Sequence, residues 1–355
     1  MAVSEDFTNV TGRLRGELLA YCYRMLGSAE EAEDLVQETY LRAWRSYERF
    51  EGRSSVRTWL YRIATNVCLT AIERRGRRPL PSGLGAPGGG TEPVVAAREV
   101  PWLQPVPDAL LAGKHEDPAA VAVSRAGIRL AFVAALQYLS AQQRAMLILR
   151  DVLDWPAAEV ADLLGTSTTA VNSGLRRARA QLAKALPAED ELAEPTEPER
   201  RAVLERFAAA FENADVGALA ELLREDVALE MPPLRTWFSG REAVVRFFAA
   251  SPPFAAPGRF RLIPVMANGQ VAFAVYQRDS DGAYHADAVS LPTLTTTGIA
   301  RIVTFRNPGL IESFGLSPEY GADTSGTRTP GTRTPRAGSP GTSTPRAGNS
   351  GTGSA

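Results

Sequence analysis

Residues 159–179 constrain the fold of this chain more than any other stretch, because they predict two helices that meet at a tight turn. Gly165 stands where the turn is expected, and Ser167 can cap the second helix by accepting a backbone N–H. The hydrophobic residues of the second helix recur at helical spacing, as Val171, Leu175, Ala178 and Leu182. This spacing predicts one buried stripe and, together with the first helix, a helix-turn-helix.

The opposite face of the second helix is polar and basic. We assign to it Thr168, Thr169, Asn172, Ser173, Arg176, Arg177 and Arg179. Short hydrogen-bonding side chains suit base edges in a major groove. No acidic residue falls between Thr166 and Leu186, so the helix complements a phosphate backbone. The pattern therefore favours binding of duplex DNA, and the alternative is a solvated helix whose arginines pair with nothing.

A second amphipathic helix is predicted over residues 33–44, EDLVQETYLRAW. Asp34, Glu38 and Arg42 recur at four-residue intervals with Gln37 beside them, while Leu35 and Ala43 face inward. Taken alone, such a row of charges is typical of a solvated helix face.

The stretch from residue 50 to residue 78 predicts a further helix with a basic end. Its inward positions are Val56, Leu60, Ile63, Val67 and Ala71. Its outward positions are Arg57, Arg62, Thr65, Asn66 and Thr70, followed by Arg74, Arg75, Arg77 and Arg78. Arginines, amides and exposed aromatic residues such as Trp59 or Tyr61 suit single-stranded DNA, although Trp59 could equally belong to the core.

These motifs, in this order, resemble the bacterial sigma-70 family, specifically its extracytoplasmic-function group with conserved regions 2 and 4. The resemblance implies region 2 over residues 10–78 and region 4 over residues 125–186. It implies that core RNA polymerase docks, through a coiled coil of its β′ subunit, on Asp34, Gln37, Glu38 and Arg42.

The resemblance also implies where promoter DNA binds. The −10 element would be melted and held by Arg57, Trp59, Arg62, Asn66, Arg74 and Arg75, with the loop 50–55. The −35 duplex would lie on the polar face of the helix-turn-helix. Asn172 and Gly174 depart from the long basic side chains that many relatives place there. Gly174 costs about 1 kcal/mol relative to alanine, which indicates either a close approach to DNA or a tolerated weakness.

Residues 79–124 change to a Gly/Pro-rich composition and predict a linker. Within it Trp102, Leu103, Leu110 and Leu111 are unusually apolar, so this segment is expected to pack on a surface. That surface could be the C-terminal domain, a polymerase channel, or region 2 or 4. The WLQP segment resembles a subgroup of these sigma factors that carries an extra C-terminal domain.

A second linker, 187–198, precedes a separate unit over residues 199–320. Two helical segments, at 200–215 and 216–226, precede alternating strands, so we expect an α+β cone. Alternation places Val271, Phe273 and Val275 opposite Ala272, Ala274 and Tyr276. It groups His285, Asp287 and Val289 on one strand face, and Arg301, Val303 and Phe305 on another.

This unit resembles the SnoaL-like branch of the nuclear-transport-factor-2-like fold, which ketosteroid isomerases and polyketide cyclases also use. An acid/base pair of His285 and Asp287 is one hypothesis. A small-molecule pocket lined by Trp237, Tyr276, His285 or Asp287 is another. The resemblance favours a third, in which the domain performs no bond chemistry and regulates the sigma factor in cis, replacing or supplementing an anti-sigma factor.

Composition agrees with an intracellular, multidomain protein. The patterns and the resemblance together give two all-α helical domains, the second with the helix-turn-helix, followed by the α+β cone and a tail. Net charge is +3 over residues 1–186 and −7 over residues 187–320. Cys22 and Cys68 lie in apolar helical patterns, and the sequence offers no metal or cofactor site. No secretion signal or membrane span is evident, so we expect a cytoplasmic protein. The tail, residues 321–355, is rich in Gly, Ser, Thr and Pro and is expected to be disordered. A stand-alone, ligand-responsive helix-turn-helix regulator remains the alternative function.

Overall fold

The computed structural model describes residues 2–47, 50, 52, 54–111, 127–185 and 196–321, without the side chains of residues 2–10 and 185. The chain divides into two units after Gly321, and the second unit, residues 322–355, lies outside this description. The prediction of a disordered tail therefore falls on residues that are not described. Residues 112–124 and 187–195 of the two predicted linkers, and residues 125, 126 and 186 of predicted region 4, also lie outside the described residues.

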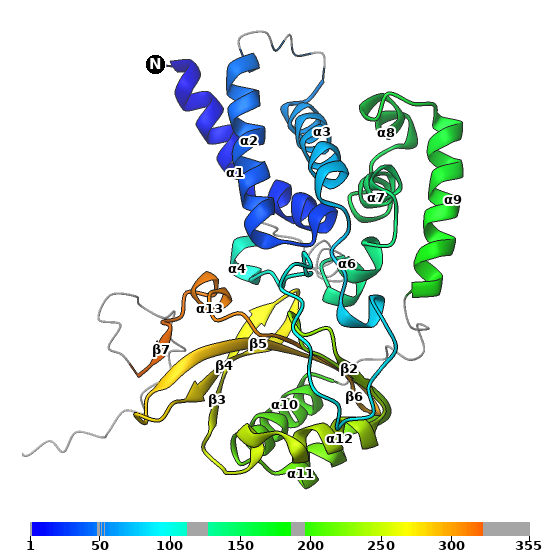
Figure 1. Ribbon diagram of the computed structural model, residues 1–355. Coiled ribbons are helices and arrows are strands. Elements are labelled where there is room, and N and C mark those ends of the chain that lie inside the picture. The colour runs from blue at the N-terminus through cyan, green and yellow to red at the C-terminus, as the bar shows by residue number, and fades with distance from the viewer. Residues whose placement is uncertain are drawn as a thin grey trace, which may run out of the picture. The chain divides into compact units, whose positions relative to one another are not determined.

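Three long helices form the N-terminal part, α1 (Ala2–Leu26), α2 (Ala29–Ser46) and α3 (Val56–Arg75) (Figure 1). Serine caps begin the second and third, because the Ser28 hydroxyl accepts the Glu31 N–H and the Ser55 hydroxyl accepts the Thr58 N–H. The core between them holds both cysteines, which are fully buried, as their apolar helical patterns indicate. A hydrogen bond with Cys22, together with burial, raises the pKa of Cys68 well above its usual value.

The second helical part contains the predicted helix-turn-helix. It consists of α6 (Leu130–Leu136), α7 (Ala141–Leu147), the π-helical turn η3 (Ile148–Val152), α8 (Ala157–Leu163) and α9 (Thr168–Ala185). The Ser167 hydroxyl accepts the Ala170 N–H at 3.1 Å, so the predicted cap is present. Val171, Leu175 and Ala178 are buried and Leu182 is half-buried, as the spacing predicts.

The C-terminal part is an α+β cone, as predicted. Its helices are α10 (Glu197–Glu212), α11 (Val216–Leu222), α12 (Arg241–Ala250), η5 (Pro252–Phe254) and α13 (Leu310–Ser313). Its strands are β1 (Leu223–Glu230), β2 (Trp237–Ser239), β3 (Phe260–Ala267), β4 (Gln270–Arg278), β5 (Tyr284–Thr295), β6 (Gly298–Phe305) and β7 (Glu319–Tyr320). The order is β2-β1-β6-β5-β4-β3, with β7 on β5, and α10, α11 and α12 cover the concave face (Figure 1).

Two details of this sheet differ from the sequence prediction. The helix expected over 216–226 ends at Leu222, because the following residues form β1, which pairs in parallel with β6. In β5, a bulge leaves Asp287 without a partner on β4 and reverses the alternation of the strand. His285 and Val289 therefore lie on opposite faces, and the prediction that they share one was wrong.

Phenylalanine rings fill the concave side of the cone. Phe211 lies edge-on to Phe254, at 4.6 Å between ring centroids, and to Phe260 at 5.1 Å. Phe207 packs on Phe273 of β4, at 5.7 Å. This cluster takes the inward residues of β4, whereas Ala272, Ala274 and Tyr276 point to the convex face, so the predicted alternation of that strand is confirmed.

The predicted linker lies along the C-terminal domain as a strap, defined here as residues 85–97. Its main chain bonds to β2 and the turn before it, with Gly88 N donating to Trp237 O at 2.8 Å and Ala97 N to Pro233 O at 2.9 Å. Gly90 has a φ of +104°, and a Cβ built there would lie 2.4 Å from the Ala243 carbonyl oxygen. The glycines expected to make a loose tether thus allow close contact between main chains.

The remainder of the linker contains the short helices η2 (Pro81–Gly83) and α4 (Asp108–Leu111). Trp102 is buried and donates its indole N–H to Ala97 O at 2.8 Å, while Leu103 is fully buried against the N-terminal helices. Leu110 and Leu111 are half-buried on the same cluster. The apolar linker residues therefore pack within the chain itself, on both the N-terminal helices and the C-terminal domain.

Candidate functional site

The polar face of α9 is open. Thr168, Thr169, Asn172, Arg176, Arg177 and Arg179 are exposed, and Ser173 is half-buried. Arg179 is held in place, because its guanidinium donates to both carboxylate oxygens of Asp151, at 2.6 and 2.9 Å. The hydrogen bond that Arg179 donates to Asp151 also raises the pKa of Arg179. Arg176 and Arg177 are the arginines of this face best placed to meet a phosphate backbone.

Gly174 lies on the other side of α9 and is buried. A Cβ built there would lie 2.5 Å from the Met146 sulfur atom of α7. The glycine therefore permits close packing of two helices inside the domain, and a close approach to DNA, one of the two explanations offered by the sequence, is wrong.

The predicted protein-binding face of α2 is exposed at Asp34, Gln37 and Arg42, and half-exposed at Glu38. Arg42 donates to Glu38 at 2.7 Å, and both border a 270 Å³ cavity shared with Arg74 and Arg75 of α3. The sequence analysis missed Leu41 and Trp44, which are 52% and 48% exposed. Leu41 and Trp44 follow Gln37 at helical spacing and so share its helix face, and this spacing could have identified them. Large apolar side chains among charges are typical of a protein-binding surface.

Some of the residues of α3 predicted to bind single-stranded DNA are exposed, and others contact side chains of this protein. Asn66 and Arg74 are exposed. Arg57 pairs with Glu17 at 3.0 Å, Arg75 pairs with Glu31, and Arg62 pairs with Asp162 of α8. Trp59 is half-buried and packs on Phe50, with 4.8 Å between ring centroids. Residues 51 and 53 of the predicted loop lie outside the described residues.

Two residues expected on the outer face of α3 are buried. Tyr61 is fully buried between Tyr21 and Trp155, at 5.2 Å from each ring. Thr65 is fully buried and shares a 2.7 Å hydrogen bond with the Tyr21 hydroxyl. The prediction of exposure was wrong because α1 covers Thr65 through Tyr21, and Trp155 of the helix-turn-helix part covers Tyr61. The periodicity of one helix cannot reveal such neighbours.

We name the contact of α3 with α8 and the residue Trp155 before it the closed contact, formed by Arg57, Tyr61 and Arg62 with Trp155 and Asp162. The Arg57 guanidinium lies over the Trp155 ring, 5.8 Å from its centroid. Tyr61 Oη, Arg62 Nε and Trp155 Nε1 are buried and find no hydrogen-bond partner among the described residues. Leaving a buried polar atom without a hydrogen bond costs about 1–3 kcal/mol, so hydrogen bonding within the closed contact is incomplete.

At a distance from the closed contact, buried arginines join the N-terminal helices to the helix-turn-helix part. Arg144 of α7 donates to the Met25 carbonyl at the end of α1 and to Gln137, and Arg24 of α1 donates to the Gly127 carbonyl at 2.8 Å. Burial lowers the pKa of Arg24 and of Arg144 to about 10. Both arginines are still largely protonated at neutral pH.

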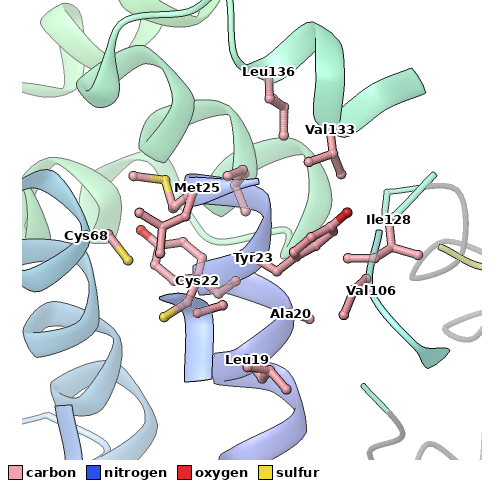
Figure 2. Packing of buried hydrophobic residues seen from close by; sticks show 14 of the residues in the cluster. Leu19, Ala20, Cys22, Tyr23, Met25, Cys68, Val106, Ile128, Val133 and Leu136 are labelled. Atoms are coloured by element: carbon pink, nitrogen blue, oxygen red, sulfur yellow. The ribbon is translucent and has the colours of Figure 1, made fainter. Parts of the chain in front are cut away.

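A single turn of the C-terminal domain, Asn268-Gly269, reaches three other parts of the chain. The Asn268 amide donates to the Tyr23 hydroxyl and to the Ile128 carbonyl, each at 2.8 Å, and its side-chain oxygen accepts the Val106 N–H at 3.0 Å. Figure 2 shows Tyr23 extending from α1 toward Val106 of the linker and Ile128. The N-terminal helices, the linker, the helix-turn-helix part and the cone thus meet at one side chain.

The four residues considered for a pocket in the cone do not converge. Trp237 donates to the Gly85 carbonyl of the strap, and Tyr276, which is buried on the convex face, donates to the Ser317 carbonyl. His285 lies 3.9 Å from Asp281 and 4.0 Å from Glu319, whereas Asp287 pairs with Arg306 at 3.1 Å. The proposed acid/base pair of His285 and Asp287 is therefore not assembled.

In the part of the chain that the structure describes, no group of three or more His, Cys, Asp or Glu side chains is arranged to hold a metal ion. No helix among the same residues has the length and hydrophobicity to cross a membrane.

Comparisons with known proteins agree with this division of the chain. The sigma-70 region 2 family matches residues 11–78, the sigma-70 region 4 family matches residues 129–182, and the SnoaL-like domain family matches residues 204–307. The chain is 49% identical over 313 residues to the ECF RNA polymerase sigma factor SigG of Mycobacterium tuberculosis, covering 88% of this chain and 84% of the relative.

A second relative from the same species is the ECF sigma factor SigJ, which is 29% identical over 292 residues, 79% of this chain and 85% of SigJ. The crystal structure of SigJ has the same fold, with a TM-score of 0.55 at 24% identity, and covers 89% of this chain and 100% of that one. The chain therefore belongs to the extracytoplasmic-function (ECF) sigma factors of RNA polymerase.

Proposed function

We propose that this sigma factor is restrained in cis, with its promoter-binding helix α3 held by its own helix-turn-helix domain until RNA polymerase engages it. The closed contact is the observation that supports this proposal. Arg57 and Arg62, which we assign to −10 DNA, are the same side chains that contact Trp155 and Asp162. A strand of DNA and α8 cannot occupy this face of α3 together.

The surface that we assign to polymerase is free of this restraint. Asp34, Gln37 and Arg42 are exposed on α2, and Leu41 and Trp44 add apolar area beside them. We place the β′ coiled coil of core polymerase on this face. Polymerase would then bind the restrained protein first, and the closed contact would open afterwards. This order keeps the free protein from occupying promoters without polymerase.

For promoter DNA we retain Trp59, Asn66, Arg74 and Arg75 with the two restrained arginines as the −10 set. For the −35 duplex we propose the exposed face of α9, led by Thr169, Asn172 and Arg176. The buried polar atoms of the closed contact support opening, because each regains water or a DNA partner when α8 leaves.

The C-terminal domain supports the restraint by contact, through the strap and Asn268. The linker between regions 2 and 4 is hydrogen-bonded to this domain along much of its length, so the two regions cannot separate freely while it stays docked. We propose no turnover by this domain. Its concave interior is packed with phenylalanine rings, and His285 and Asp287 contact different partners.

Reversing one charge at the closed contact tests this proposal. In Asp162→Arg the new arginine repels Arg62, and Asp162 is 77% exposed, so the fold of α8 should tolerate the change. With limiting sigma factor and core polymerase, we expect about a fivefold higher yield of promoter-specific transcript, equivalent to roughly 1 kcal/mol.

The matched control is Glu159→Arg, which adds the same charge one turn earlier on α8 at an exposed position. It reproduces any general attraction of α8 to DNA without touching Arg62. Equal yields from Asp162→Arg and Glu159→Arg would contradict the restraint.

A further inference from the structure

A groove with a volume of about 530 Å³ lies between the linker and the C-terminal domain. The linker contributes residues 98 and 100–104, and the domain contributes residues 232–233 and 305–308 with Leu310. Arg78, after the end of α3, lies at the same groove. A volume of this size is typical of sites for small molecules.

The charge lining the groove has one sign. Three arginines border it, Arg78, Arg98 and Arg306, and no carboxylate side chain is among the lining residues. Arg78 pairs with Glu31 at 2.6 Å and Arg306 pairs with Asp287 at 3.1 Å. Arg98 is exposed and makes no ion pair with any residue that the structure describes. At least one guanidinium is thus available to an incoming anion.

Most of the remaining lining is apolar, and Gln104 and Asn307 add two amide groups. Trp102 is 8% exposed and its indole N–H is fixed on Ala97 O, while Phe305 is 2% exposed. Pro101, Pro232 and Pro233 complete the wall. Side chains fixed in this way lose little conformational entropy when a flat apolar group packs on them.

We propose that this groove binds a small organic anion, a carboxylate or phosphate attached to an apolar body, with Arg98 as the principal anion contact. Such a molecule touches the linker and the C-terminal domain at once. It therefore favours the docked linker and, given the cis restraint proposed above, lowers activity.

Binding is tested without polymerase, so that its result does not depend on the proposed regulation. The full-length chain is titrated by calorimetry with 2-naphthoate, with 2-naphthyl phosphate and with the neutral 2-naphthamide. We expect saturable binding of one anion per chain, with the naphthamide at least about tenfold weaker. The stronger of the two anions identifies the preferred head group.

Arg98→Gln should weaken the anion about tenfold and leave the naphthamide unchanged, because it removes only the charged contact. Arg201→Gln, at an exposed position of α10 outside the groove, is the matched control and should bind like the unaltered chain. Absence of saturable binding for both anions, or equal affinities in Arg98→Gln and Arg201→Gln, would overturn the site. Binding that leaves transcription unchanged would contradict only the cis restraint.

Discussion

Asn268 shows how one side chain joins parts of the chain that are far apart in sequence. Its φ of +53° suits the turn before Gly269, a pairing that the sequence displays as Asn-Gly between two strands. That the same amide reaches Tyr23, Val106 and Ile128 is not visible in the sequence, because the local turn rule specifies only the backbone. The residue types favour the turn, and tertiary contacts give the Asn268 side chain a second role.

Replacing Asn268 by glycine isolates this second role. Glycine keeps the positive φ but leaves the Val106 N–H and the Ile128 carbonyl without their buried partner, at about 1–3 kcal/mol each. We expect the free energy of unfolding, measured by urea and tryptophan fluorescence, to fall by at least about 2 kcal/mol. Tyr23→Phe should cost less in this background than in the unaltered chain, because it then removes only the hydrogen bond that Tyr23 donates to the Gln104 carbonyl at 2.8 Å. An unchanged unfolding curve would show that the turn alone matters.

Two predictions for single residues of α3 failed because the pattern of one helix does not report its tertiary contacts. The four-residue spacing of α3 correctly placed Leu60 and Val67 inside, yet Tyr61 and Thr65 are buried as well. Periodicity describes one buried stripe, whereas α3 is packed on two sides. The predicted residues that are exposed include Asn66 and Arg74 on α3 and Thr169 and Arg176 on α9.

Among the elements, the strap departs most from what its sequence predicts. A run of Gly and Pro indicates a flexible linker when only composition is considered. Here the glycines let one main chain approach another, because a Cβ at Gly90 would strike the Ala243 carbonyl oxygen. By contrast, the helix-turn-helix and the cone were predicted correctly, because hydrophobic periodicity and capping act within each element.

Gly90→Ala should therefore detach the strap. It forces an L side chain into a φ of +104° and a 2.4 Å contact, at about 1–3 kcal/mol. Hydrogen exchange should show lost protection at the Gly88 and Ala97 amides, which bond to the C-terminal domain. Gly85→Ala is the control, because a Cβ there meets nothing within 4 Å. Equal exchange in both variants would mean that the strap is not held by close packing at Gly90.

At the scale of the whole described unit, the two sigma regions are joined by contacts rather than by chain connectivity alone. Arg24 and Arg144 bind carbonyl groups of the opposite helical part, and the closed contact covers one face of α3. Sequence motifs identified the regions, because each motif is local. The contacts between regions join residues about 100 positions apart, such as Arg62 with Asp162, and no periodicity reports such pairs.

Core RNA polymerase tests the account most directly. The full-length chain and its Asp162→Arg variant are each mixed with core polymerase and genomic DNA fragments, and the 5′ ends of the transcripts are sequenced. We predict the same discrete start sites from both proteins, at a higher yield from the variant. An absence of discrete starts from both would contradict the assignment of promoter-directed initiation, and equal yields would contradict restraint of α3 by α8.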